Sequence, residues 1–125
     1  MSSKKILIVE DDEMIGSMYQ TKLKQDDFNV FLAVNGIEGL ELAKKEKPDL
    51  ILLDIIMPQL DGFSVLEQLK DKESTKDIPV VMLTNLGTEE DVKKGSVLGA
   101  VDYLVKANLT PSQVSDKIKE ILKIK

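Results

Sequence analysis

Five polar residues of this chain follow apolar stretches, and their types suit one kind of chemistry. They are Glu10, Asp11, Asp54, Thr84 and Lys106. Three carboxylates placed together repel one another and favour a bound cation. Because the chain has no histidine or cysteine, hard oxygen ligands would select Mg²⁺, Mn²⁺ or Ca²⁺, and sparse protein ligands suit Mg²⁺ best. A hydroxyl and an ammonium would bind a phosphoryl group, which a carboxylate nucleophile can accept.

Each of these residues also has an ordinary explanation when it is taken alone. An acid after a strand is more often a helix cap than a ligand, and a threonine there usually belongs to a turn. A lysine at such a position is usually solvated. Only the joint arrangement favours a site, because all five side chains are expected at one edge of the fold and are chemically complementary.

The clearest positioning element is the stretch 50–62, which has the sequence LILLDIIMPQLDG. Four apolar residues end at the single carboxylate of Asp54, and a turn containing Pro58 and Asp61 follows. This pattern is typical of a buried parallel strand that presents one charged group at its carboxyl end. An isolated carboxylate beside so much hydrocarbon is costly to ionise, so Asp54 requires a partner.

Apolar stretches that predict strands alternate five times with amphipathic stretches that predict helices. We expect strands at 6–9, 28–31, 49–54, 80–83 and 100–105, and helices beginning near Asp12, Asn35, Gly62, Thr88 and Thr110. Continuous apolar strands joined by helices imply a parallel sheet covered on both faces. Ligands bind such sheets outside the carboxyl ends of the strands, where the five polar residues are expected.

The helix starts carry recognisable caps. Asn35 is expected to cap its helix, with Glu38 placed to reciprocate. Thr110, Pro111 and Gln113 combine a cap, a first-position proline and a third-position glutamine, which is a complete capping box. These signals support the helical assignments.

Composition excludes several other classes of function. The chain has 125 residues, 42% hydrophobic and 31% charged, which is ordinary for one folded domain. The absence of histidine and cysteine excludes thiolate and imidazole zinc sites and the Ser-His and Cys-His nucleophile pairs. A net charge of −5, with all 17 basic residues being lysines, argues against direct nucleic-acid binding. No stretch approaches membrane-spanning length and no signal peptide is indicated, so we expect a cytoplasmic protein without membrane contact.

Taken together, these motifs resemble the receiver domains of two-component response regulators, and the resemblance covers residues 1–125. The matching segments are IVEDDE, LLDIIMPQLDG, VVMLTN and VDYLVKA. The resemblance implies an α/β fold, a doubly wound five-stranded parallel sheet in the order 2-1-3-4-5 with five helices, as in flavodoxin-like proteins. It also implies a single receiver domain with no output domain in this chain.

The resemblance assigns metal and acceptor roles residue by residue. Asp54 resembles the phospho-acceptor, and Asp11 resembles the direct Mg²⁺ ligand, with Mn²⁺ as a possible substitute. Glu10 would act on the metal mainly through water. The backbone carbonyl of Ile56 would complete the protein ligands.

Three further residues would respond to the phosphoryl group. Lys106 would pair with the acceptor or its phosphate, and Thr84 would bond a phosphate oxygen. Tyr103 matches the aromatic switch position of the family and would turn inward as Thr84 moves. An ordinary half-buried strand aromatic is the alternative for Tyr103.

The implied function is a phosphorylation-dependent signalling switch. The donor would be a sensor histidine kinase or a histidine phosphotransfer protein, because this chain has no histidine of its own. Phosphorylation would shift the face of the last two helices and last strand toward binding a downstream protein, or a second copy as a homodimer. The chain would assist its own phosphorylation and dephosphorylation without being an enzyme with turnover.

Two positions depart from the usual pattern of the family. Ala107 follows Lys106 where a proline in a cis bond is usual. A cis bond to a non-proline residue costs about 2.5–4 kcal/mol, so the expectation is either a trans bond or a cis bond held against that cost. Asn85 follows Thr84 where a small residue is usual, and its amide is expected to crowd the phosphoryl group or to position water.

Three other interpretations stay open. The chain could be a degenerate receiver that acts as a pure interaction module, although the acids, Thr84 and Lys106 are all retained. A Mg²⁺-dependent phosphatase of the haloacid dehalogenase type also uses an aspartate after a strand, but needs a second acid where this chain has Ile56. A flavodoxin-like cofactor binder shares the fold, but needs glycines or hydroxyls where this chain has acids after its first strand.

Overall fold

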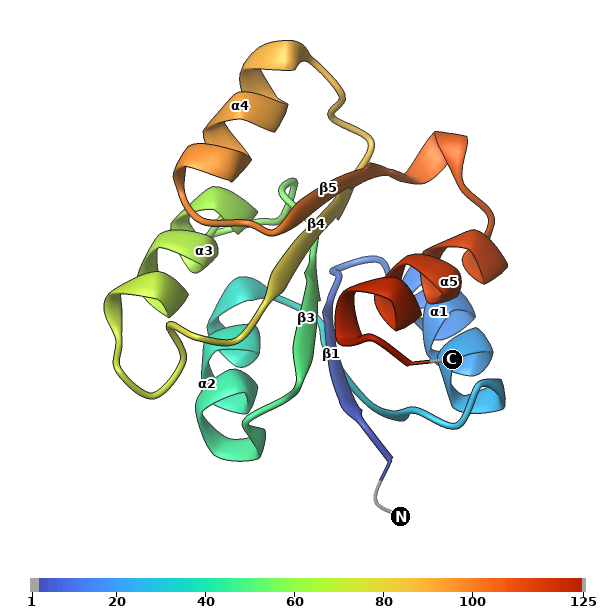
Figure 1. Cartoon of the computed structure of the whole chain (residues 1–125). Coiled ribbons are helices and arrows are strands. Elements are labelled where there is room, and N and C mark those ends of the chain that lie inside the picture. Colours follow the sequence, from blue (N-terminus) through green and yellow to red (C-terminus); the bar gives the residue numbers. More distant parts are fainter. Residues whose placement is uncertain (1–2, 125) are drawn as a thin grey trace.

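The computed structural model describes residues 3–124, in which five strands alternate with five helices (Figure 1). The strands are β1 (Lys5–Val9), β2 (Asn29–Ala33), β3 (Leu50–Leu53), β4 (Val80–Thr84) and β5 (Asp102–Val105). The helices are α1 (Glu13–Gln25), α2 (Gly36–Glu46), α3 (Gly62–Asp71), α4 (Glu89–Val97) and α5 (Pro111–Leu122), and a short 3₁₀ turn, η1 (Lys106–Asn108), follows β5. Each element lies where the sequence predicts it, with boundaries that differ by a few residues.

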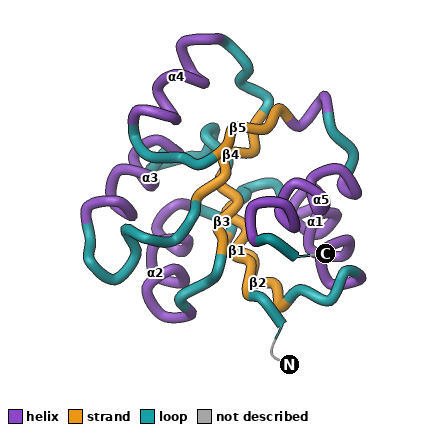
Figure 2. Tube along the Cα trace, viewed as in Figure 1, coloured by secondary structure: helices purple, strands orange, loops and turns teal. Residues whose placement is uncertain are grey.

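The strands form one parallel sheet in the order β2-β1-β3-β4-β5. This confirms the predicted doubly wound fold with strand order 2-1-3-4-5. Figure 2 shows the sheet between helices on both faces. Because β3 lies at the centre, its carboxyl end is flanked by β1 and β4, which brings Asp54 between the polar residues of those two strands.

Two hydrophobic clusters cover the two faces of the sheet. Alternate residues of β1 and β3 divide between them, so that Leu7 and Ile51 pack with α2 and α3, while Ile6 and Leu52 pack with α1 and α5. All four residues of β3 are at most 1% exposed, which explains why its sequence is continuously apolar rather than alternating. No helix within residues 3–124 has both the length and the apolar character needed to span a membrane.

Side-chain caps begin the helices. Asp12, Asn35, Asp61 and Thr88 each accept a backbone N–H from the first turn that follows. At the start of α5 both halves of the predicted capping box are present. The α4 helix buries only Gly95 among its residues, so it is held to the sheet by fewer apolar side chains than the other helices.

Asp26, the C-cap residue of α1, joins that helix to α5. Its carboxylate accepts a hydrogen bond from the Ser115 hydroxyl and lies 3.5 Å from the Nζ atoms of both Lys22 and Lys119. The Ser115 hydrogen bond is the main reason that the pKa of Asp26 is lowered, and the two lysines add to it. This polar contact therefore stabilises the packing of α1 against α5 when Asp26 is ionised.

We expect Ser115→Ala to destabilise the fold in a pH-dependent way. Ser115 is fully buried, and losing its hydrogen bond should cost about 1 kcal/mol at pH 7. Because the pKa of Asp26 is lower in the folded state, its contribution is present above the unfolded value of about 3.9 and is lost as the pH falls through the folded value. Urea unfolding from pH 7 down to about pH 3 should show the deficit shrinking.

The control is Ser112→Ala, which removes an exposed hydroxyl from the same helix and should change stability little at any pH. A Ser115→Ala deficit of the same size at every pH would contradict the assigned role of Asp26.

Candidate functional site

The predicted site residues lie at the carboxyl edge of the sheet. Glu10 and Asp11 follow β1, Asp54 follows β3, and Thr84 ends β4. Lys106 begins η1, directly after β5. The parallel strands therefore deliver chemically complementary groups from four chain segments to one place.

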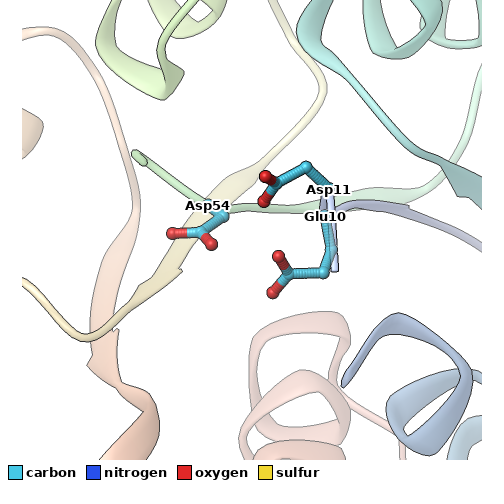
Figure 3. Close-up of side chains that lie close together, drawn as sticks. All are labelled: Glu10, Asp11 and Asp54. Atoms are coloured by element: carbon cyan, nitrogen blue, oxygen red, sulfur yellow. The ribbon is translucent and has the colours of Figure 1, made fainter. Parts of the chain in front are cut away.

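The three carboxylates converge, as Figure 3 shows. One oxygen from each of Glu10, Asp11 and Asp54 lies within 4.8 Å of the others. Glu10 and Asp54 are only 3% and 7% exposed, whereas Asp11 is exposed. The cluster thus combines two nearly buried acids with one that solvent reaches.

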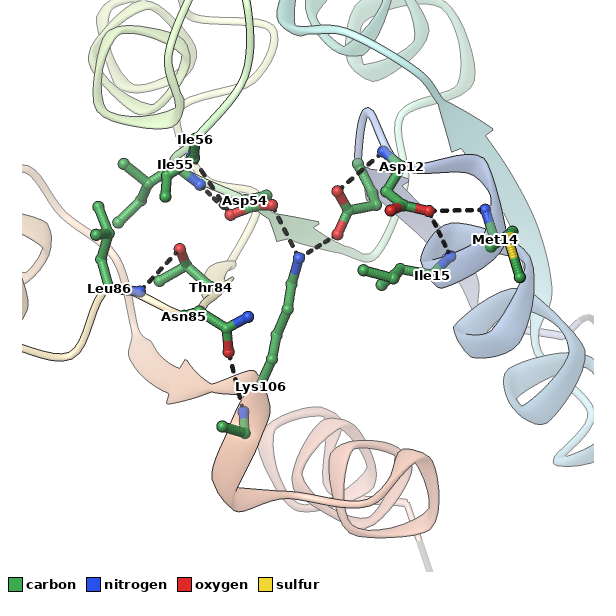
Figure 4. A network of polar contacts seen from close by, with 12 residues as sticks. Asp12, Met14, Ile15, Asp54, Ile55, Ile56, Thr84, Asn85, Leu86 and Lys106 are labelled. Carbon is green, nitrogen blue, oxygen red and sulfur yellow. Dashed lines mark hydrogen bonds and ion pairs between the residues drawn. The ribbon is translucent and has the colours of Figure 1, made fainter.

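Lys106 is the cationic partner that the buried Asp54 requires. Its Nζ donates to Asp54 Oδ2 at 2.8 Å and also to a carboxylate oxygen of Glu10. The other oxygen of Asp54, Oδ1, accepts the backbone N–H of Ile55 at 2.7 Å and that of Ile56 at 3.4 Å. Both oxygens of Asp54 are therefore held in a defined orientation (Figure 4).

The electrostatics of the site follow from burial and from this ion pairing. Burial raises the pKa of Glu10, while hydrogen bonds from Lys106 and from the backbone N–H of Asp12 oppose that rise. Burial alone would lower the pKa of Lys106, but its hydrogen bonds to Asp54 and Glu10 outweigh burial, so its pKa is raised. Lys106 therefore stays charged, and its ammonium pairs with two of the three clustered carboxylates, those of Asp54 and Glu10.

The donor set fits a hard divalent cation. All three acids offer oxygen ligands, and a single lysine leaves an excess of negative charge among them. Asp11 forms no ion pair within residues 3–124, and its exposure leaves the carboxylate accessible. Ile56 is 58% exposed, and its backbone N–H donates to Asp54 Oδ1. That its backbone carbonyl is a metal ligand stays a prediction.

The loop after β4 links Thr84 to its neighbours. Thr84 is fully buried, and its hydroxyl oxygen accepts the N–H of Leu86 at 3.3 Å. The Leu86 carbonyl accepts the hydroxyl of Tyr103, which is half-buried on β5. Burial raises the pKa of Tyr103 to about 12, so this hydroxyl remains a donor at neutral pH. The switch role of Tyr103 stays a prediction.

The two departures from the usual pattern are in contact with each other. Asn85 Oδ1 accepts the N–H of Ala107 at 3.1 Å. Residues 3–124 contain no cis peptide bond, so the bond between Lys106 and Ala107 is trans. The sequence alone leaves the state of that bond open and does not indicate this contact, because no local signal relates position 85 to position 107.

Gly62 lies against the backbone that carries Asp54. Its N–H donates to the Ile55 carbonyl at 2.9 Å. A Cβ at position 62 would lie 2.1 Å from the Asp54 carbonyl oxygen and 2.7 Å from Ile55 Cα. The turn that follows Asp54 therefore requires glycine for lack of space.

The fold and the site together define a class of small α/β protein with a lysine-paired acidic cluster at the carboxyl edge of a parallel sheet. A family model described as the response regulator receiver domain matches residues 6–119. The chain belongs to that family, the receiver domains of two-component response regulators.

Curated relatives and solved structures agree with this assignment. The chain is 45% identical over 102 residues to the DNA-binding dual master transcriptional regulator RpaA of Synechocystis, covering 82% of this chain and 42% of that protein. It is 40% identical to the alkaline phosphatase synthesis transcriptional regulatory protein PhoP of Bacillus subtilis, covering 97% of this chain and 49% of that protein. The chain thus spans about half the length of these relatives or less.

Solved receiver structures superimpose over nearly the whole chain. A CheY-like receiver domain protein from Methanospirillum hungatei has a TM-score of 0.90 at 30% identity, covering 98% of this chain and 95% of that one. The chemotaxis protein CheY4 of Vibrio cholerae has a TM-score of 0.89 at 28% identity, covering 95% and 98%.

Proposed function

We propose that this receiver domain is a phosphorylation-dependent switch in which Asp54 accepts the phosphoryl group. The observation that carries the proposal is the environment of Asp54. Its Oδ2 lies 2.8 Å from the Lys106 ammonium, and two further acids lie close enough to share a cation with it. A carboxylate held in this way is oriented as a nucleophile at a site prepared for the charge of a phosphoryl group.

In the proposed transfer, a carboxylate oxygen of Asp54 forms a bond to phosphorus. The bond between phosphorus and the donor nitrogen of a histidine breaks, and the nitrogen keeps the electron pair. Asp11 and Asp54, together with Glu10 and the Ile56 carbonyl, would hold a Mg²⁺ or Mn²⁺ ion, and such an ion would neutralise charge on the phosphoryl oxygens. Lys106 compensates the remaining charge and holds the acceptor in position.

The proposed switch begins at Thr84. Its hydroxyl oxygen accepts the Leu86 N–H, and its O–H can donate to a phosphate oxygen, so a movement of Thr84 toward the phosphoryl group would pull Leu86 and this loop with it. Tyr103 contacts the same loop through the Leu86 carbonyl and would move with it. Because α4 is held by few apolar side chains, the face formed by α4, β5 and α5 is the surface expected to change.

The expected partners follow from this mechanism. The donor is a sensor histidine kinase or a histidine phosphotransfer protein, and the changed face would bind a downstream protein or a second receiver. Both relatives are named as transcriptional regulators, and the Synechocystis protein is also named as DNA-binding; this chain covers 42% and 49% of their lengths. With its net charge of −5, we expect the receiver to act through protein contact rather than through direct binding of nucleic acid.

The proposal is tested by incubating the chain with a small acyl phosphate and Mg²⁺ and measuring the intact mass. We expect one phosphoryl adduct that depends on Mg²⁺ and that Asp54→Asn abolishes. Asp71→Asn, which alters an exposed acid at the end of α3, is the matched control and should keep the adduct.

An adduct that persists in Asp54→Asn would overturn the assignment of the acceptor. No adduct in the unaltered chain, together with no heat of Mg²⁺ binding in calorimetry, would favour the degenerate receiver that acts only as an interaction module. Steady turnover of small phosphate esters would instead favour the phosphatase interpretation.

A further inference from the structure

The backbone pairing between β4 and β5 ends at Thr84, at the edge of the sheet where the site lies. The last registered pair is Thr84 with Val105. The following residues, Asn85 and Lys106, leave the ladder, and β5 is an edge strand with no other neighbour within residues 3–124. The Asn85 side chain continues the connection beyond this point, because its Oδ1 accepts the Ala107 N–H at 3.1 Å (Figure 4).

The turn that begins with Lys106 has no cap of its own. Its cap residue, Val105, makes no side-chain hydrogen bond to it. The first N–H groups of a helical turn lack partners inside the turn. Asn85 supplies that partner to Ala107 from the loop that follows β4. A proline at position 107 would have no N–H to donate, so the contact requires a residue such as alanine there.

The same short loop also contacts the other proposed switch residues. The Thr84 hydroxyl oxygen accepts a hydrogen bond from the Leu86 N–H, and the Leu86 carbonyl accepts one from the Tyr103 hydroxyl. Lys106 directly precedes Ala107, and its side chain donates hydrogen bonds to Asp54 and Glu10. The amide of Asn85 therefore connects the loop that carries Thr84 to the turn that carries Lys106.

We infer that Asn85 is a positioning residue for Lys106. It holds the η1 turn in register with the loop after β4, so that the ammonium stays on Asp54 and a movement of Thr84 is transmitted to Lys106. This differs from a direct effect of the amide on the phosphoryl group. The consequence for phosphorylation rests on the proposed function, whereas the contact and its effect on Lys106 do not.

The first experiment needs no phosphorylation. It measures by NMR the hydrogen exchange of the Ala107 amide and the chemical shift of Lys106 Nζ. In Asn85→Ala we expect the Ala107 amide to exchange about three- to tenfold faster and the Lys106 signal to move. Asn85→Asp keeps an acceptor oxygen and should retain the protection.

The matched control is Asn108→Ala, which removes an exposed amide from the same turn and should change neither signal. If Ala107 exchanges equally fast in the unaltered chain and in Asn85→Ala, or if the Lys106 signal does not move, the inference is wrong.

The second experiment measures the rate of phosphorylation by a small acyl phosphate. We expect Asn85→Ala to slow it about three- to tenfold and to lower the melting temperature by no more than a few degrees, because one hydrogen bond between exposed residues is lost. Ala107→Pro removes the donor of the same hydrogen bond, so adding Asn85→Ala to that variant should have no further effect. An equal effect of Asn85→Ala in both backgrounds would show direct action on the phosphoryl group and would overturn the inference.

The two experiments separate the possible failures. If the unaltered chain takes up no phosphoryl group, the proposed function fails, and the exchange and Lys106 signals still decide whether Asn85 positions the lysine.

Discussion

Lys106→Met is expected to slow phosphorylation of Asp54 by about a hundredfold or more and to destabilise the fold at neutral pH. No other lysine within residues 3–124 forms an ion pair with Glu10 or Asp54. Removing a group that stabilises developing charge costs about 10²–10³ in rate. Leaving buried carboxylates without their cation costs about 3–5 kcal/mol. Acyl phosphate kinetics and urea unfolding at pH 7 measure the two effects.

The stability deficit of Lys106→Met should depend on pH and on Mg²⁺. Burial already raises the pKa of Glu10, and loss of the ammonium removes a group that opposes this rise. A folded-state pKa above the unfolded value of about 4.3 means that the folded state gains stability by taking up a proton as the pH falls. The deficit should therefore be largest near neutral pH and shrink on acidification, and Mg²⁺ should reduce it at pH 7.

Lys44→Met is the matched control, because Lys44 is an exposed lysine on α2 that forms no ion pair within residues 3–124. It should change neither the rate nor the stability appreciably. A normal phosphorylation rate in Lys106→Met, or a deficit that is the same at every pH, would contradict the assigned role of Lys106.

Gly62→Ala is expected to destabilise the fold by about 3 kcal/mol or more. The added Cβ would meet the Asp54 carbonyl oxygen at 2.1 Å and the backbone of Ile55 at 2.7 Å. Backbone atoms at the end of the central strand cannot rotate away as a side chain can, so the loop that carries Asp54 must shift. Urea unfolding should show the loss, and phosphorylation should slow because the carboxylate is displaced from Lys106.

The comparison variant for Gly62→Ala is Gly87→Ala. There a Cβ would meet only the side chain of Val105, at 3.3 Å, and the chain around it is exposed. We expect a change within about 1 kcal/mol. Equal, small effects of the two substitutions would show that the loop after β3 has more room than the structure indicates.

The sequence by itself determined the fold and the place of the site. The continuous apolar run of β3 indicated a strand buried on both faces, and residues 50–53 are indeed at most 1% exposed. The capping box of Thr110 and Gln113 predicted the start of α5 and is present. These signals are local, since an apolar run and a helix cap are each formed by residues close together in the chain. The acids, the hydroxyl and the lysine each follow or end a strand, so the rule that ligands bind at the carboxyl ends of parallel strands predicted that they would lie at one edge of the sheet.

Only the tertiary structure decided which groups touch. The sequence showed that Asp54 needs a partner, but the sharing of Lys106 between Asp54 and Glu10 depends on side chains from three separated strand ends. The contact of Asn85 with Ala107 depends on the register of β4 against β5, and the need for glycine at position 62 depends on a backbone approach. Periodicity defines which face of an element is buried; register and packing distance, which no local pattern encodes, define the contacts.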